Sequence, residues 1–213
     1  MSIVLNSTGG GSVTINEPTT ASNFTQTLPA ITGNIAVSSS SFGLIPAELI
    51  YRLNTAYVGT ATTSAQSFFG VGVTLSGSTI YEFEAVIAIS KTATASSHNL
   101  QLGFGGTATL NNIAYEYYQT QSSITSFNDT TNGAIYGGFL QTASATTIAA
   151  ASSAAVFKLI LIKGTVSVNA SGTFIPQYTT SVSVGPYTTA IGSYFKLSPL
   201  GASGANTSIG TWA

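Results

Sequence analysis

The feature that most restricts the fold of this chain is a regular alternation of apolar and polar side chains. It is clearest in the run IYEFEAVIAIS, residues 80–90, where Glu82 and Glu84 share one face. The opposite face is apolar throughout and consists of Tyr81, Phe83, Ala85, Ile87 and Ile89. A two-residue repeat matches a β-strand, whose successive side chains point to opposite faces, and does not match the 3.6-residue repeat of a helix. The run therefore predicts a strand with one buried face.

Similar patterns recur along the rest of the chain at short intervals. Further strand-like runs cover residues 71–75, 100–104, 114–118, 134–140, 157–168, 173–184 and 191–197. Turn-forming pairs such as Gly105-Gly106 and Asn132-Gly133 stand between them. Many short strands separated by frequent turns are typical of antiparallel sandwiches and jelly rolls. We therefore predict an all-β fold, an antiparallel jelly-roll β-sandwich over residues 48–213, with no helix beyond a turn near residues 46–50.

The N-terminal region alternates in the same way but is too thin in large apolar residues to close a core. Pro18 and Pro29 interrupt it. Strands without a core need partner strands to pair their backbone groups. We predict a β arm over residues 1–37 that pairs with other copies or a docking surface, and a linker over residues 38–47. The contact residues expected in the arm are Val13, Ile15, Phe24 and Leu28.

One predicted strand is apolar on both faces. In VFKLILIKG, residues 156–164, one face carries Phe157, Leu159 and Leu161, and the other carries Val156, Ile160 and Ile162. One face of an antiparallel sheet commonly meets water, so a second apolar face needs a cover. Two covers fit the pattern, a loop folded over the outer face or another subunit. For the second case, a homotrimer, the expected contact residues are Val156, Ile160 and Ile162.

Composition excludes several classes of function. Only 5% of the residues are charged and the formal net charge is −1, whereas soluble globular chains average about 25% charged residues. Without a basic patch, neutralisation of phosphates cannot drive nucleic-acid binding. No apolar run approaches the ~18 residues of a membrane-spanning helix. So few charges suit a protein held in a large assembly better than a free monomer.

Candidate catalytic residues are few. His98 is the only histidine and cysteine is absent, which excludes a Cys/His zinc site. A Ser-His-Asp triad would need Asp129, the only aspartate, and no nucleophile-elbow motif accompanies it. We expect His98 to lie in a turn or at a strand edge. The residues Asn128-Asp129 and Asn132-Gly133 are better explained as turns than as a calcium loop.

The acidic residues offer a weaker candidate. Glu82 and Glu84 lie about 7 Å apart on one strand face, and Glu116 joins them only if its strand is adjacent. Paired carboxylates can hydrolyse glycosides or bind a cation, but a solvent-facing salt bridge is the simpler interpretation. We therefore predict no enzymatic activity, no cofactor and no metal. The tyrosines around residues 115–118 suit core or subunit contacts, and sugar stacking is the functional alternative.

Two parts of the chain resemble a known family. The residues Gly11, Val13, Thr14, Ile15, Pro18, Thr25, Thr27, Leu28, Pro29, Thr32 and Gly33 match a connector pattern found in many tailed-phage fibre and structural proteins. The segments 66–109 and 194–213 are similar to the head domain that often follows this connector, including in cyanophages. The family is a virion module and carries no catalytic residues.

The resemblance implies a virion structural protein, assembled in the bacterial host cytoplasm, that forms a homotrimer with an intertwined β arm and a jelly-roll head. Its implied partners are its own copies and other capsid or tail proteins, with no nucleic acid and no membrane. The short chain favours a capsid decoration, head fibre or short fibre docked by the arm. The alternative is a receptor-binding tail fibre or tail-tip protein that recognises host surface glycan.

Overall fold

The chain divides into two compact units, Met1–Ala36 and Val37–Ala213. The computed structural model describes residues 2–6, 12–16, 48–120 and 135–204. In the first unit, β1 (Ser2–Asn6) and β2 (Ser12–Asn16) form an antiparallel hairpin. Within the described ranges every regular element is a β-strand, and no helix there is long and apolar enough to cross a membrane.

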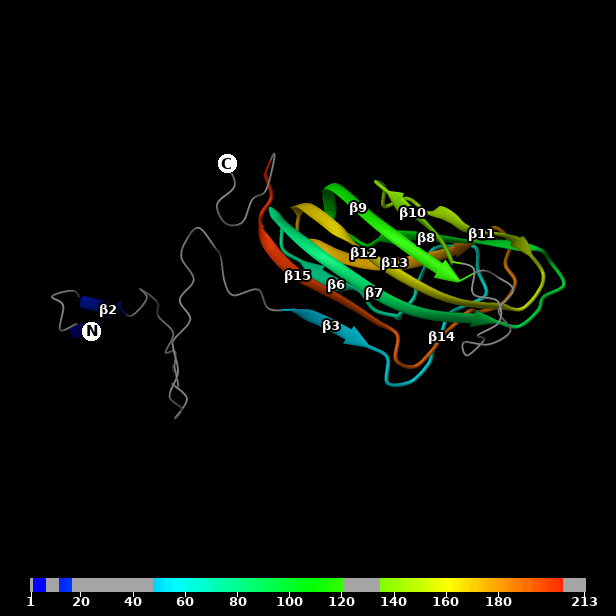
Figure 1. The fold of residues 1–213 in the computed structure, drawn as a ribbon, viewed down its shortest axis with the longest axis horizontal. Helices are drawn as coiled ribbons and strands as arrows, with labels where there is room; N and C mark the ends of the chain where they lie inside the picture. Colours follow the sequence, from blue (N-terminus) through cyan, green and yellow to red (C-terminus); the bar gives the residue numbers. More distant parts are fainter. Residues whose placement is uncertain (1, 7–11, 17–47, 121–134, 205–213) are drawn as a thin grey trace. The chain divides into compact units, whose positions relative to one another are not determined.

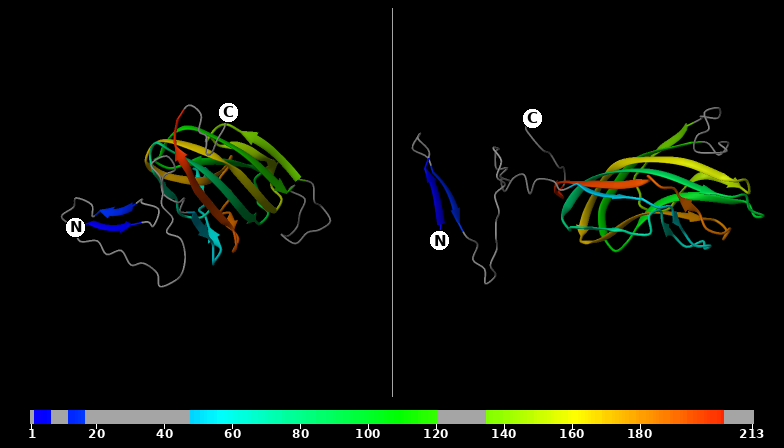
Figure 2. Two further views of the ribbon diagram at one scale, coloured as in Figure 1. Left: turned by 60° about the vertical axis from the view of Figure 1, so that its left-hand side comes forward. Right: turned by 90° about the horizontal axis from the view of Figure 1, so that it is seen from below.

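The second unit, called the head below, contains two antiparallel sheets (Figure 1). The large sheet has the order β3 (Leu49–Arg52), β15 (Tyr194–Ala202), β7 (Thr79–Lys91), β12 (Val156–Ala170), β9 (Thr109–Thr120) and β10 (Ile135–Leu140). The short strand β14 (Thr188–Thr189) pairs with β7, and β4 (Tyr57–Val58) pairs with β14. The small sheet has the order β11 (Thr146–Ser152), β8 (His98–Gly105) and β13 (Gly172–Thr180), and β13 also pairs with β5 (Gln66–Ser67) and β6 (Val73–Leu75). Figure 2 shows the head from two further sides.

The strand pairings have the nested order of a jelly roll. Strand β8 pairs with β11, β7 with β12, β5 and β6 with β13, and β3 with β15, so each pair encloses the previous one in the sequence. Successive members of this series alternate between the two sheets, which is a long hairpin rolled into a sandwich. The β9–β10 hairpin is inserted between β8 and β11 and extends the large sheet beyond β12. The predicted all-β antiparallel jelly-roll sandwich is confirmed.

The core lies between the two sheets and is rich in aromatic rings. Phe83 of β7 is central, with ring centroids 5.2 Å from Phe104, 5.8 Å from Phe174 and 6.1 Å from Phe195. Phe104 and Phe174 stack with centroids 4.9 Å apart. Such ring pairs contribute about 0.5–1.5 kcal/mol beyond the burial of their area. The apolar face predicted for residues 80–90 is buried in this core.

The register of β12 corrects the face that the sequence assigned to subunit contact. Ile160 lies opposite Ile87 and Ile162 opposite Ala85, and directly paired residues share a face, so these side chains point inward. Val156, Ile160 and Ile162 are buried in the core of the head itself and leave almost no surface for a partner. The outward face of β12 is the one that carries Leu159 and Leu161.

Candidate functional site

Two of the four predicted arm residues belong to a strand that the structure describes. Val13 and Ile15 belong to β2, where they pair with Leu5 and Ile3 of β1. Phe24 and Leu28 lie outside the described residues, as does Asp129. The surface of the head therefore supplies the candidate site.

His98 is the first residue of β8, a strand that lies between β11 and β13 in the small sheet. Its side chain is buried, and its Nε2 lies 2.6 Å from the hydroxyl of Tyr187. Its Nδ1 lies 3.4 Å from the carbonyl oxygen of Ser96, which can only accept, so Nδ1 carries the proton and Nε2 accepts from Tyr187. Burial raises the pKa of Tyr187, which keeps this hydroxyl protonated. Both ring nitrogens are thus engaged inside the head.

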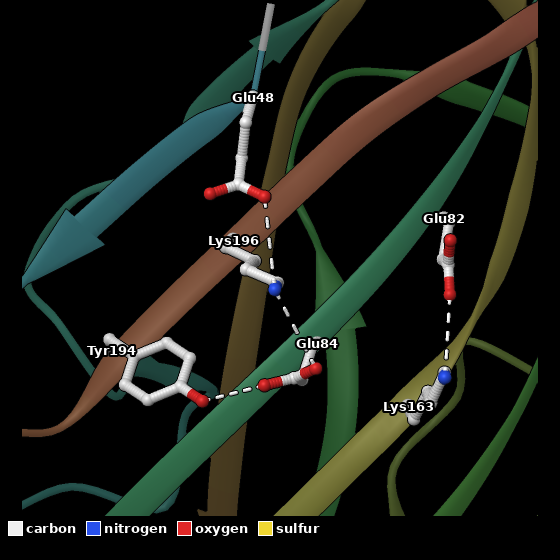
Figure 3. Close-up of polar contacts among 6 residues, drawn as sticks. All are labelled: Glu48, Glu82, Glu84, Lys163, Tyr194 and Lys196. Carbon is white, nitrogen blue, oxygen red and sulfur yellow. Dashed lines mark hydrogen bonds and ion pairs between the residues drawn. The ribbon is translucent and has the colours of Figure 1, made fainter. Parts of the chain in front are cut away.

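Glu84 belongs to a group of charged side chains on the outer face of the large sheet, most of which are drawn in Figure 3. We call Glu48, Glu82, Glu84, Glu116, Lys163 and Lys196 the charged row. The Lys196 ammonium lies 3.8 Å from the Glu84 carboxylate and 3.7 Å from that of Glu48. The Tyr194 hydroxyl donates a 2.6 Å hydrogen bond to Glu84, and this bond is the main cause of the raised pKa of Tyr194. The Glu84 side chain is therefore held between a cation and a phenol.

The other carboxylates of the row have partners as well. The Lys163 ammonium lies 3.6 Å from Glu82, and the Tyr118 hydroxyl donates a 3.3 Å hydrogen bond to Glu116. Strand pairing does bring the third carboxylate close, because Lys163 stands opposite both Glu84 and Glu116. Among the described residues no group of three histidine, aspartate or glutamate side chains is placed to hold a metal ion. The row has the character of surface ion pairs, as the sequence suggested.

An apolar patch adjoins the charged row on the same outer face. Leu161 stands opposite Val86 of β7 on one side and Tyr118 of β9 on the other, so these three side chains form one row across the sheet. Leu159 lies two positions along the same strand face. We call Val86, Tyr118, Leu159 and Leu161 the outer patch. Leu159, Leu161 and Tyr118 are 38%, 42% and 47% exposed, although a sheet face in contact with water is usually polar.

A shallow hollow of about 240 Å³ joins the outer patch to the charged row. Val86, Tyr118 and Leu161 supply apolar lining, whereas Glu84, Glu116 and Lys163 supply charge. The hollow thus offers apolar contact and hydrogen-bonding groups within a few ångströms of each other. This combination suits either another protein surface or a sugar ring stacked on the tyrosine.

Strand β10 lies at one edge of the large sheet (Figure 1). It pairs with β9, and its side chains Ile135, Tyr136 and Phe139 remain largely exposed. Tyr136 and Phe139 lie opposite Gln119 and Glu116, which point to opposite faces of β9, so β10 presents apolar groups on both sides. An exposed edge strand of this kind favours association with another chain.

Lys158 is a buried residue whose position the sequence did not reveal. The alternation suggested that it brackets an apolar run, but its place opposite Ile89 turns it toward the core, and the residue is 1% exposed. Its ammonium donates a 2.9 Å hydrogen bond to the carbonyl oxygen of Thr120. Burial lowers the pKa of Lys158 to about 8, because the charged form loses its hydration.

Comparison with known proteins gives little further information. No family model matches the sequence, and no curated protein matches it. Solved structures of the VP2 protein of infectious bursal disease virus are similar at a low level. A VP2 variant in derived T=1 particles shares 9% identity at a TM-score of 0.18. The match covers 89% of this chain and 45% of the VP2 chain. The VP2 subviral particle shares 9% identity at a TM-score of 0.20, with 89% and 46% covered.

The chain spans about half the length of the VP2 chains that it matches. TM-scores this low do not establish a shared fold. The jelly-roll assignment of the head follows from its own strand order.

Proposed function

We propose that this chain is a non-enzymatic structural protein of a virus particle, of the tailed-phage type that its sequence resembles. In this proposal it forms a homotrimer, docks to other virion proteins through its N-terminal arm, and serves as a capsid decoration, head fibre or short fibre. The observation that carries the proposal is the outer patch, an apolar row exposed on a sheet whose opposite face already forms a complete core.

The outer patch supports assembly because contiguous exposed apolar groups commonly mark interaction surfaces. The ion pairs of the adjacent charged row lie beside the patch, as polar rims do around the apolar centres of many interfaces. The low overall charge points the same way, since a chain with a net charge of −1 has little self-repulsion to keep its copies apart.

The absence of catalysis remains part of the proposal and has local support. His98 is buried against Tyr187, and Glu82, Glu84 and Glu116 each contact a lysine or tyrosine. A glycoside hydrolase needs one carboxylic acid to donate a proton and a second carboxylate to act as nucleophile or base. Here lysine ammonium groups lie beside two of the three carboxylates, those of Glu82 and Glu84.

Deletion of residues 1–37 tests the docking role. We expect the truncated chain to yield a soluble head that no longer enters particles, measured by mass spectrometry of particles purified from producing cells. The full-length Ile191→Lys variant is a control, because Ile191 is 63% exposed and lies outside the outer patch and the charged row. Normal incorporation of the truncated chain would contradict arm-mediated docking.

The hollow favours a second candidate function, recognition of host surface glycan by a receptor-binding protein. Tyr118 offers a ring face for stacking, and Glu116 and Lys163 offer groups that bind hydroxyls. A glycan array probed with the folded full-length protein tests it, with Tyr118→Ala as the expected loss. Tyr136→Ala is the matched control, because Tyr136 is 55% exposed and does not line the hollow. A folded protein that binds no glycan on the array or on host cells would leave only the structural role.

A further inference from the structure

An apolar groove of about 420 Å³ runs along the edge of the head where β3 and the β5–β6 segment face each other. Leu49 and Tyr51 stand on the β3 side, and Val71 stands on the other side. The rest of the lining is Glu48, Ile50, Phe69, Gly72, Val73, Pro176, Phe195 and Leu197, which includes a single charged side chain. The structure thus leaves an open, mainly apolar groove on the surface of the head.

The groove has a backbone edge as well as apolar walls. Strand β3 pairs with β15 on one side, and among the described residues no strand pairs with its other side. In Figure 1, β3 lies at the border of the large sheet beside β15. Leu49, Tyr51 and Val71 are 38%, 45% and 42% exposed. An open edge beside an apolar groove is the arrangement that binds an added β-strand, with main-chain hydrogen bonds and pockets for alternate side chains.

The chain itself contains a segment with matching chemistry. Residues 24–28, FTQTL, carry large apolar side chains at both ends and no charge. Five extended residues span about 17 Å, comparable with the four residues of β3 at about 13 Å. An uncharged segment also suits a groove whose lining holds one carboxylate, that of Glu48. Phe24 and Leu28 lie on the same face of such a strand and can both enter the groove.

We propose that the groove receives residues 24–28 from the arm of a second copy of this chain, as a strand added to β3. The inference rests on the proposed self-association and names the surface that receives the arm. Each copy would give its arm to the next, and three such contacts close into a ring.

The connecting length favours a second copy over the chain's own head. Nineteen residues, 29–47, separate Leu28 from Glu48, which lines the groove. A hairpin from the chain's own segment would need a loop of this length, whereas hairpin loops usually have about 2–5 residues. The same stretch has a root-mean-square span of about 25 Å as a flexible chain and up to about 65 Å when extended. A head of this size is about 40 Å across, so the arm can reach a neighbour.

The first experiment compares Val71→Lys with Val58→Lys in the full-length protein. Both valines are about half exposed, at 42% and 55%, but only Val71 lines the groove. We expect Val71→Lys to raise the dissociation constant of the trimer at least tenfold, measured by light scattering over a dilution series, with unchanged circular dichroism. Val58→Lys should assemble like the unmodified chain.

The outcomes separate this inference from the proposed function. If the unmodified chain is a trimer and Val71→Lys dissociates at the same concentration, the groove does not receive the arm and the inference fails alone. If the unmodified chain is a monomer, the proposed homotrimer fails and the inference fails with it.

The second experiment uses the absence of cysteine from the sequence. A tagged Phe24→Cys chain and an untagged Val71→Cys chain are co-expressed and oxidised, and we expect a mixed disulfide dimer on a non-reducing gel. Each variant expressed alone controls for chance pairing. A third chain that carries both changes tests pairing within one copy. A disulfide that forms only in this doubly substituted chain would assign the groove to the chain's own arm and overturn the proposal. No disulfide in either case would also overturn it.

Discussion

The two faces of the large sheet differ in what holds their apolar side chains. On the inner face, Phe83 and its aromatic neighbours pack against the small sheet and are buried. On the outer face, Leu161 and Tyr118 stand beside a row of ion pairs and remain about half exposed. Strand β12 contributes to both faces with alternate residues. Apolar character alone therefore does not assign a residue to a face, because the register with β7 decides which residues enter the core.

Truncation of a side chain on the inner face should lower the free energy of unfolding far more than truncation of one on the outer face. Phe83→Ala should lower the free energy of unfolding by about 3–5 kcal/mol, because it removes a buried ring and leaves a cavity among aromatic neighbours. Leu161→Ala on the outer face should cost less than about 1 kcal/mol in the dissociated chain. Denaturant unfolding of both variants at low concentration measures the contrast. Equal losses would contradict the assignment of the two faces.

A second effect comes from Lys158, a buried lysine on the inner face of the large sheet. Because burial lowers the pKa of Lys158 to about 8, the unfolded chain binds more protons than the folded chain between pH 8 and the ordinary lysine pKa of 10.5. Stability contributed by this residue therefore rises with pH, by about 2 kcal/mol from pH 7.5 to 9.5.

Substitution of Lys158 isolates this contribution from other titrating groups. In Lys158→Met the rise in the free energy of unfolding over this range should be smaller by about that amount, measured by denaturant unfolding at each pH. Lys163→Met is the matched control, because the Lys163 side chain is 60% exposed, and it should keep the slope of the unmodified chain. A slope in Lys158→Met equal to that of the unmodified chain would mean that Lys158 is not buried as described.

The smallest effect tests the charged row on the outer face. Glu84→Gln removes the carboxylate that accepts from Tyr194 and pairs with Lys196, at a cost of about 0–1 kcal/mol for a partly exposed pair. The pKa of Tyr194 should fall toward its ordinary value, because Glu84 is the main cause of its rise. Spectrophotometric titration reports this change, and Glu82→Gln should leave it unaltered. An unchanged tyrosine titration in Glu84→Gln would contradict the contact.

The sequence predicted those parts of the fold that depend on local alternation. Strand β7 and its buried face follow directly from the period-two pattern of residues 80–90. The turn expected near residues 46–50 was wrong at Leu49 and Ile50, which belong to the edge strand β3. The sequence of β3 is LIYR, and its first three side chains are all largely apolar, so no alternation is visible. Strands of two residues, such as β4 and β14, are too short to show any pattern.

The candidate sites depend on contacts between distant residues, which alternation does not encode. The sequence alone does not show that Ile160 points into the core, because both faces of β12 are apolar. The pairing of Ile160 with Ile87 shows it. His98 meets Tyr187 across 89 positions, and no local motif indicates that pair. The groove likewise combines β3 with Pro176 and the C-terminal strand β15. The sequence did indicate that β12 has two apolar faces, which pointed to a contact surface without showing which face it is.

The molar mass of the full-length chain in solution, measured by multi-angle light scattering, tests the central claim that the head is built for self-association. A homotrimer predicts about 65 kDa, three times the chain mass of 21.7 kDa. Leu161→Lys, which places a charge in the outer patch, should shift the mass toward 21.7 kDa while the circular dichroism of the fold is retained. A stable, folded species of 21.7 kDa for the unmodified chain at micromolar concentration would contradict the claim.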